Sequence, residues 1–307
     1  MKTKKITVVV PLGEHREYTA LESVKKQKPS VNLFLEIGRN PPQNRNKGVK
    51  KAKTEFVAFI NGHTILSDDW SKNVLKFFKE HQEIDIVGGP QLNHEKDSFF
   101  AKTSGYVMSS LFGGATIANR YKISKLDLNA DESQLTSSNL ICRKKVFSKV
   151  LFNESIYPGE DPKFISDAIS QGFRVASTPS IAVYNKRRQN LKGFLKQTFN
   201  YGNTRPQQHD FATTLKKPLF FIPSLFVLYI VLFGFLSALH MMFIAPLILY
   251  ILLSLFFSFY EAVNNKSFLA FFVLPIIFFH THVAYGLGFL YGLVQKKRLP
   301  QLTDVVQ

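Results

Sequence analysis

The chain has 307 residues, a formal net charge of +17 and one cysteine, so no intrachain disulfide can form and a reducing compartment is expected. Nearly all charged residues precede Pro218, whereas residues 218–260 and 267–295 contain no Lys, Arg, Asp or Glu. A chain of this length cannot bury two such segments in a soluble core, which argues against a wholly soluble protein.

Short apolar runs alternate with helix-compatible segments in the first 90 residues. Strands are expected at residues 6–11, 31–37, 55–60 and 84–87, and helices at 16–26, 44–53 and from residue 67 onward. Ser67 is expected to cap the third helix, with Asp68 and Asp69 in its first turn. The alternation predicts an α/β fold with a mostly parallel sheet, right-handed crossovers and flanking helices.

Ligands of such sheets bind beyond the carboxyl ends of the strands. The residues expected at that edge are Pro11, Glu14, Glu36, Asn61 and His63. The chain has no G-x-G-x-x-G or Walker sequence, which excludes a dinucleotide oxidoreductase and a P-loop enzyme. An ordinary Asn-Gly-His turn and an exposed strand-end acid are the alternative interpretations at Asn61 and Glu36.

Two adjacent acids, Glu160 and Asp161, precede a helix expected at residues 162–171 and ended by Gly172. Asp161 either caps this helix or offers a carboxylate in the preceding turn. Farther along, apolar residues at i, i+3, i+4 and i+8 from Leu191 alternate with lysines, which is typical of a helix lying on a bilayer.

The apolar segments predict membrane crossings. Residues 218–260 would extend about 65 Å as one helix, so two crossings are expected, at 218–238 and 241–260. The third segment, 268–294, contains His280, His282 and several glycines, and either spans or re-enters. A third crossing would place the basic tail, residues 296–307, opposite the soluble domain, against the positive-inside tendency. No signal-peptide core follows the N-terminal lysines, so we expect a cytosolic domain on a multi-pass protein of the inner membrane.

The basic soluble part predicts an anionic partner, such as lipid headgroups, diphosphates or nucleotides, unless the surface is merely solvated. Net charge alone also suggests a membrane-bound nucleic-acid-binding module. The chain has no aromatic-basic binding motif, so nucleic acid is not expected as a partner.

The order of these motifs resembles family 2 glycosyltransferases over about residues 5–205. The motifs are a strand ending at Pro11, a strand ending at Glu36, Arg45-Asn46-x-Gly48, Asn61-Gly62-His63-Thr64, Gly88-Gly89-Pro90 and Gly159-Glu160-Asp161. The motif Asn61-Gly62-His63-Thr64 and the segment at residues 281–288 are similar to those of a membrane-bound bacterial branch that includes succinoglycan-type polysaccharide transferases. The resemblance implies a GT-A type, Rossmann-like domain at 1–184, an interfacial amphipathic and basic linker at 185–217 and a transmembrane region at 218–295.

The resemblance also implies an inverting transfer from a nucleotide-diphosphate sugar to a lipid-linked or growing surface-glycan acceptor. Asp161 would be the base that removes the acceptor's proton, and Glu160 would orient the acceptor. Other glycan-assembly proteins are possible partners. The alternative is a catalytically decayed transferase that acts as a binding or assembly factor, an interpretation supported by Asn61 in place of an acid.

On the donor side, the resemblance implies that Glu36 reads the nucleobase or ribose, and that Arg45 and Asn46 lie beside the diphosphate. A plain surface helix is the alternative for the last two. The family's Asp-x-Asp motif reads Asn61-Gly62-His63 here, so a divalent cation, Mn²⁺ or Mg²⁺, would meet one imidazole and one neutral amide.

The linker between the soluble part and the membrane holds further candidates. In related enzymes this region closes over the diphosphate as an interfacial helix, and membrane lipids are equally plausible partners of its cationic groups. The residues expected to contact phosphate or lipid are Arg187, Arg188, Gln197, Tyr201 and Arg205.

Overall fold

The structure is a computed structural model that describes residues 5–13, 19–208 and 218–295. The chain divides into two compact units. The first, here called the sheet unit, contains the described residues up to 94 and residues 119–186. The second, here called the helical unit, contains residues 95–118 and the described residues from 187 onward. The segment 95–118, which the sequence places inside the soluble domain, therefore clusters with the apolar C-terminal helices.

A six-stranded sheet forms the centre of the sheet unit, in the order β2-β1-β3-β7-β5-β8. Its strands are β1 (Ile6–Leu12), β2 (Asn32–Ile37), β3 (Phe56–Phe59), β5 (Ile86–Gly88), β7 (Leu140–Arg143) and β8 (Val175–Ser177). β1 is parallel to β2 and β3, and β5 is parallel to β8, whereas β7 is antiparallel to both β3 and β5. The predicted α/β fold with a mostly parallel sheet is confirmed, and the four strands expected from the sequence correspond to β1, β2, β3 and β5.

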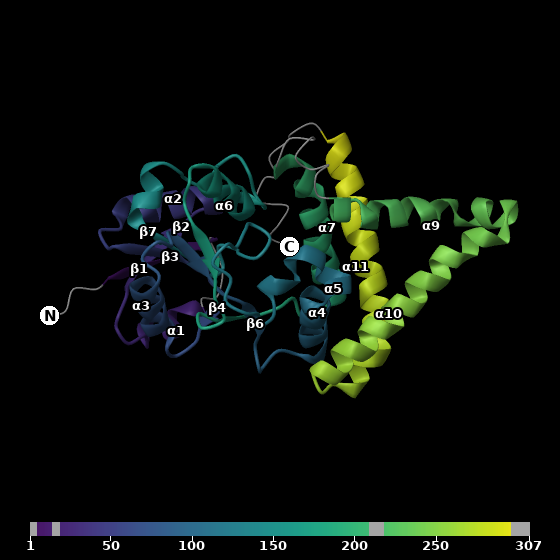
Figure 1. Cartoon of the computed structure of the whole chain (residues 1–307), viewed down its shortest axis with the longest axis horizontal. Helices are drawn as coiled ribbons and strands as arrows, with labels where there is room; N and C mark the ends of the chain where they lie inside the picture. Colours follow the sequence, from purple (N-terminus) through teal and green to yellow (C-terminus); the bar gives the residue numbers. More distant parts are fainter. Residues whose placement is uncertain (1–4, 14–18, 209–217, 296–307) are drawn as a thin grey trace. The chain divides into compact units, whose positions relative to one another are not determined.

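Alternation along the strands gives the sheet two apolar faces. Val8 and Val10 point toward α1 (Ala20–Lys25) and α3 (Trp70–Glu80), and Val9 and Val57 point toward α2 (Pro41–Lys51) and α6 (Glu160–Ser170). Figure 1 shows α1 and α3 on one side of the strands and α2 and α6 on the other. The sheet unit thus has three layers.

Two helices begin earlier than the sequence suggests. α2 begins at Pro41 rather than residue 44, because the Asn40 side chain caps it by accepting from the Gln43 N–H at 3.1 Å, and prolines suit the first helical positions. α6 begins at Glu160 rather than Pro162. The acid pair therefore lies inside the first turn of α6, and the N-cap is Gly159 rather than Asp161.

The expected cap of α3 is wrong. Asp69 occupies the N-cap position without a side-chain hydrogen bond, and no acid lies in the first turn. Ser67 contributes its backbone carbonyl to the Trp70 N–H at 3.1 Å instead of its hydroxyl.

A smaller sheet in the order β4-β9-β6 completes the sheet unit, formed by β4 (Thr64–Leu66), β9 (Val183–Asn185) and β6 (Gln91–Asn93). β9 is antiparallel to β4 and parallel to β6. One 3-10 turn, η2 (Lys144–Ser148), follows β7.

The helical unit consists of α4 (Phe99–Ser109), α5 (Leu111–Gly114), α7 (Leu191–Gln208), α9 (Ile222–Leu239), α10 (Ala245–Asn264) and α11 (Phe268–Val294). Short 3-10 turns, η1 (Ala115–Arg120), η3 (Pro218–Phe220) and η4 (Met241–Ile244), adjoin these helices. Three stretches are long and apolar enough to cross a membrane, at Ile222–Leu239, Met241–Asn264 and Phe268–Val294. They correspond to the three apolar segments of the sequence.

Candidate functional site

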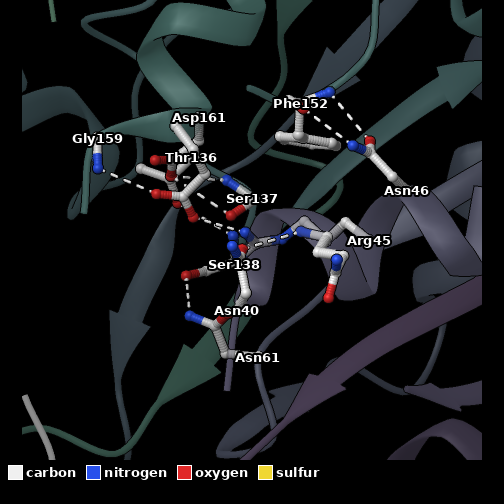
Figure 2. Close-up of polar contacts among 12 residues, drawn as sticks. Asn40, Arg45, Asn46, Asn61, Thr136, Ser137, Ser138, Phe152, Gly159 and Asp161 are labelled. Atoms are coloured by element: carbon white, nitrogen blue, oxygen red, sulfur yellow. Dashed lines mark hydrogen bonds and ion pairs between the residues drawn. The ribbon is translucent and has the colours of Figure 1, made fainter. Parts of the chain in front are cut away.

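The antiparallel direction of β7 brings a new loop to the carboxyl edge of the sheet. Phe59 pairs with Leu140, so the residues after β3 meet the residues before β7. Asn61 donates its side-chain N–H to the Ser138 hydroxyl at 2.7 Å. The loop at residues 136–139 therefore lies at the edge where the parallel strands end (Figure 2).

Asp161 contacts the same loop from the first turn of α6. Its Oδ2 accepts from the Ser137 backbone N–H at 3.1 Å and faces the Ser137 hydroxyl at 3.4 Å. Within the described ranges, no hydrogen-bond donor reaches Oδ1, and the side chain is half-buried. One carboxylate oxygen is thus fixed, while the other has no hydrogen-bond partner among the described residues.

Glu160 faces the other way and is buried. Its Oε1 lies 2.5 Å from Nη1 of Arg45, and both side chains are less than 5% exposed. Its Oε2 accepts from the Gly159 N–H at 3.0 Å. The Arg45 guanidinium also lies 5.4 Å from the centre of the Phe152 ring. Glu160 therefore joins α6 to α2 and does not present its carboxylate to solvent.

The pKa of Glu160 is raised from 4.5 to about 7, mainly by burial and then by the neighbouring Asp161 carboxylate, although Arg45 lowers it. The two adjacent acids thus have different environments. Desolvation is the largest of these effects on Glu160, so its proton is held more tightly in the folded chain than in an open one.

Two asparagines of the α2 region hold the segment that leads into α6. Asn46 donates to the Phe152 carbonyl at 2.9 Å and accepts from the Phe152 N–H at 3.0 Å. Asn40 donates to the Glu154 carbonyl at 2.9 Å. Figure 2 shows Asn46 beside Phe152. These contacts favour positioning roles for Arg45 and Asn46, since both side chains are already engaged within the protein.

A buried series of hydrogen bonds connects the small sheet to the 136–139 loop. Thr64 donates to Asn185 at 2.7 Å, Asn185 to Gln91 at 2.6 Å, and Gln91 to the Thr136 hydroxyl at 2.6 Å. The Ser138 N–H in turn donates to the Thr136 hydroxyl at 3.2 Å. Buried hydrogen bonds therefore hold the loop that contacts Asp161 and Asn61 in place.

The remaining strand-end candidates lie on the β1–β2 side of the sheet. Pro11 is opposite Glu36 in the strand register. Glu36 accepts from the Lys51 ammonium at 2.8 and 3.0 Å. Glu14 lies outside the described residues, so its predicted role is neither supported nor opposed.

The residues expected to hold a cation are a poor donor set. His63 is half-buried in the turn between β3 and β4, and Asn61 offers a neutral amide oxygen. In the described part of the chain, no three His, Cys, Asp or Glu side chains gather as ligands. A divalent cation prefers anionic oxygens, so these two side chains alone do not fit one well.

The five linker candidates belong to the helical unit. Gln197 donates to the Tyr201 hydroxyl at 2.9 Å along α7. The Arg205 guanidinium stacks 3.5 Å from the centre of the Phe220 ring. Arg187 is half-buried and Arg188 is exposed. Their expected contacts with phosphate or lipid stay predictions.

Sequence reasoning missed Thr136, Ser137 and Ser138. The signal was present, because three hydroxyl residues and Asn139 directly precede the apolar run that forms β7. A strand recognised there as antiparallel would have placed its first residues, rather than its last, at the functional edge.

Comparisons with known proteins agree with this architecture. Residues 17–151 match the family model described as glycosyl transferase family 2. The chain is 25% identical over 272 residues to the Methanococcus voltae protein named dolichyl N-acetyl-alpha-D-glucosaminyl phosphate 3-beta-D-2,3-diacetamido-2,3-dideoxy-beta-D-glucuronosyltransferase, covering 87% of this chain and 79% of that protein.

Two further relatives match over shorter stretches. The minor teichoic acid biosynthesis protein GgaB of Bacillus subtilis is 29% identical over 132 residues, which is 41% of this chain and 13% of that protein. The S. aureus TarS 1-349 structure in complex with UDP-GlcNAc has a TM-score of 0.45 at 16% identity, covering 66% of each chain. The chain thus spans only a small part of GgaB. Residues 17–151 thus match a family 2 glycosyltransferase domain, and the chain is a glycosyltransferase.

Proposed function

We propose that the chain is an inverting glycosyltransferase that moves a sugar from a nucleotide-diphosphate sugar to a lipid-linked or growing surface-glycan acceptor. The reaction would take place at the cytosolic face of the inner membrane. The observation that carries the proposal is Asp161 at the carboxyl edge of the sheet, with Oδ2 held by Ser137 and Oδ1 without a hydrogen-bond partner among the described residues.

The geometry supports a direct displacement. The acceptor hydroxyl would approach Oδ1 of Asp161, which accepts its proton as the acceptor oxygen forms a bond to the anomeric carbon. The bond between that carbon and the diphosphate oxygen breaks, and its electron pair leaves with the nucleotide diphosphate. Attack opposite the leaving group inverts the anomeric centre. Ser137 keeps the carboxylate oriented throughout by its hold on Oδ2.

The donor would lie along the carboxyl ends of β1, β2 and β3. Pro11, Glu36 and Asn61 follow or end these strands. The Glu36 carboxylate suits an imide N–H or ribose hydroxyls, although it is paired with Lys51 in the absence of donor. The nucleotide would therefore exchange with, or share, that ammonium.

A lipid-linked acceptor is supported by two independent features. The relative from Methanococcus voltae carries a dolichyl phosphate substrate in its name and matches most of this chain. The chain itself contains three helices apolar and long enough to cross a membrane. The cytosolic placement is supported by the basic residues of the soluble part.

The test is to measure sugar transfer by the full chain in lipid with a panel of nucleotide-diphosphate sugars. D161N should lower the turnover rate by about two to four orders of magnitude and leave donor binding unchanged. D167N is the matched control, since Asp167 lies on the same helix, is paired with Lys163 and is 40% exposed. Full turnover by D161N would remove Asp161 as the base, and a product with retained anomeric configuration would remove the inverting mechanism.

A further inference from the structure

The third apolar helix, α11, is covered differently from the other two. In the most apolar 18 residues of α11, 28% are buried, compared with 11% in each of the other two apolar stretches. It is covered by α7 and the start of α9 on its C-terminal half, and by α5 and α10 nearer its N-terminal half. Whether α11 can be inserted into the hydrocarbon depends on whether these covering elements are polar or apolar.

α7 lies directly against the C-terminal half of α11, backbone to backbone. A Cβ atom at Gly288 would lie 2.1 Å from the Phe199 carbonyl oxygen, and one at Gly292 would lie 2.1 Å from that of Asn203. Only glycine fits at these two positions, because a larger residue would collide with the α7 backbone. Phe199 and Asn203 are four residues apart in α7, and Gly288 and Gly292, which face them in that order, are four residues apart in α11. The two helices therefore run side by side in the same direction.

α7 is a polar helix. Lys192 and Lys196 are exposed, and Arg205 lies near its end. Lys196 precedes Phe199 by about one turn, which places it level with the middle of α11 near Tyr285. Each lysine or arginine at the centre of a bilayer costs about 2.5–3.5 kcal/mol on insertion scales. α7 therefore belongs outside the hydrocarbon, and the half of α11 that it covers belongs there too.

The rest of α11 is at the lower limit of length for a crossing. Residues 268–284 extend about 25 Å as a helix, against a hydrocarbon thickness of about 30 Å. This part of α11 also packs against α5. The His282 Nε2 lies 2.8 Å from the Phe112 carbonyl oxygen, and the Phe112 ring stands edge-on to the Phe278 ring at 5.2 Å. Phe112 is in α5, within the segment 95–118, and the chain on both sides of that segment belongs to the sheet unit.

The first turns of α9 also meet α11 at this level. The Ser224 hydroxyl donates to the Gly286 carbonyl at 3.3 Å, and the Phe221 and Phe289 rings lie 5.0 Å apart. Farther along, α9 exposes Val231, Phe235 and Leu239. Figure 1 shows α9 leaving α11 and α10 returning toward it from the far end. The two helices that project from α11 are therefore the pair suited to cross.

We infer that α11 does not cross the bilayer but lies at its cytosolic face, with α7 on its polar side and its exposed apolar residues against the lipid. The inference rests on the proposed membrane placement of α9 and α10. The residues that would meet the acyl chains are Leu269, Phe272 and Ile276, in the half of α11 that α7 does not cover. The chain then crosses twice, and the basic tail, residues 296–307, stays on the side of the sheet unit, as the positive-inside tendency requires.

Cysteine labelling of the full-length chain in intact cells tests this topology. The only native thiol, Cys142, is buried and supplies a silent background. Single cysteines are introduced by S148C on the sheet unit, H240C between α9 and α10, and T303C in the tail, and each is exposed to a membrane-impermeant maleimide before and after permeabilisation. We expect H240C to react in intact cells, and S148C and T303C to react only once the membrane is opened.

The other outcomes separate the two levels of the argument. If T303C reacts in intact cells together with H240C while S148C is protected, α11 crosses and the inference is overturned alone. If H240C is protected like S148C, α9 and α10 do not cross, and the membrane placement in the proposed function fails with it.

Discussion

Two turns at the same edge of the sheet differ in how firmly they are held. The first turn of α6 contains two acids, and each is bonded to another element, Glu160 to Arg45 in α2 and Asp161 to Ser137 before β7. The turn after β3 contains Asn61 and His63, and Asn61 is bonded to Ser138. The first turn is anionic, whereas the second has no carboxylate.

The difference suggests that the two turns have different roles in the site. The half that would activate the acceptor is held by bonds within the protein, so little ordering remains to be done during the reaction. The half that would meet the diphosphate lacks negative charge, so it depends less on a cation bridging two groups of acids. Breaking the first turn should therefore have large effects, and altering the second should have small ones.

The largest effect is expected from R45M. The Glu160 carboxylate would stay buried without its cation, which costs about 3–5 kcal/mol of unfolding free energy. Trp70 is the sole tryptophan and is fully buried in the sheet unit, so its fluorescence during thermal unfolding in lipid or detergent measures the loss. The double variant R45M/E160M should recover most of it, because an apolar pair can replace a buried ion pair with little cost.

The matched control is K163M, which removes the partner of a half-exposed pair in the same helix. Pairs of this kind contribute less than about 1 kcal/mol. If R45M lowers the unfolding midpoint no more than K163M does, the Arg45–Glu160 pair does not hold the first turn of α6.

A smaller, pH-dependent effect is expected from E160Q. The pKa of Glu160 is raised to about 7 in the folded chain, so the folded state binds this proton more tightly than the unfolded state does. The associated stability is fully present below about pH 4.5 and is lost as the pH rises toward 7. The wild-type unfolding midpoint should fall through this window more steeply than that of E160Q.

The measurement is the Trp70 unfolding midpoint of both proteins from pH 4.5 to 8, with D167N as the surface-acid control. Groups that titrate alike in both proteins cancel in the difference. Parallel curves for wild type and E160Q would show that Glu160 keeps its ordinary pKa. The penalty of R45M should also shrink toward low pH, because a protonated Glu160 no longer needs a cation.

Most of the sheet unit could be predicted from the sequence because its signals are local. The β-branched run at β1 and the apolar run at β3 have the period and length of buried strands, and the polar residues that follow them mark the edge. Asp161 was identified by a motif resemblance, and its role as the base stays a prediction.

The partners of these residues could not be predicted, because they depend on contacts between distant segments. Arg45 and Glu160 are 115 positions apart. The loop at 136–139 reaches the site only because β7 runs antiparallel, which no local pattern announces. In the helical unit, Gly288 and Gly292 looked like interruptions of a membrane span, whereas they are the contact surface for α7.

The smallest effect is expected from N61D, which adds a carboxylate to the turn after β3. A new anionic oxygen should raise the affinity for Mn²⁺ by about tenfold, equivalent to about 1.4 kcal/mol. The Ser138 hydroxyl can donate to the new carboxylate in place of accepting from the amide, so the fold should tolerate the change. Titration of Mn²⁺ against the purified chain, followed by electron paramagnetic resonance, measures the affinity directly and without donor.

N129D is the matched control, since Asn129 is an exposed asparagine of the sheet unit and the substitution adds the same charge. A rise in affinity for N61D but not N129D would place the cation position at this turn and attribute its weakness to the missing acid. An equal response of the two variants would mean that only general electrostatic attraction was measured. The turn after β3 would then contact the donor through the Asn61 amide and the His63 imidazole. In contrast to the anionic first turn of α6, this part of the site would neutralise the diphosphate mainly with cationic side chains.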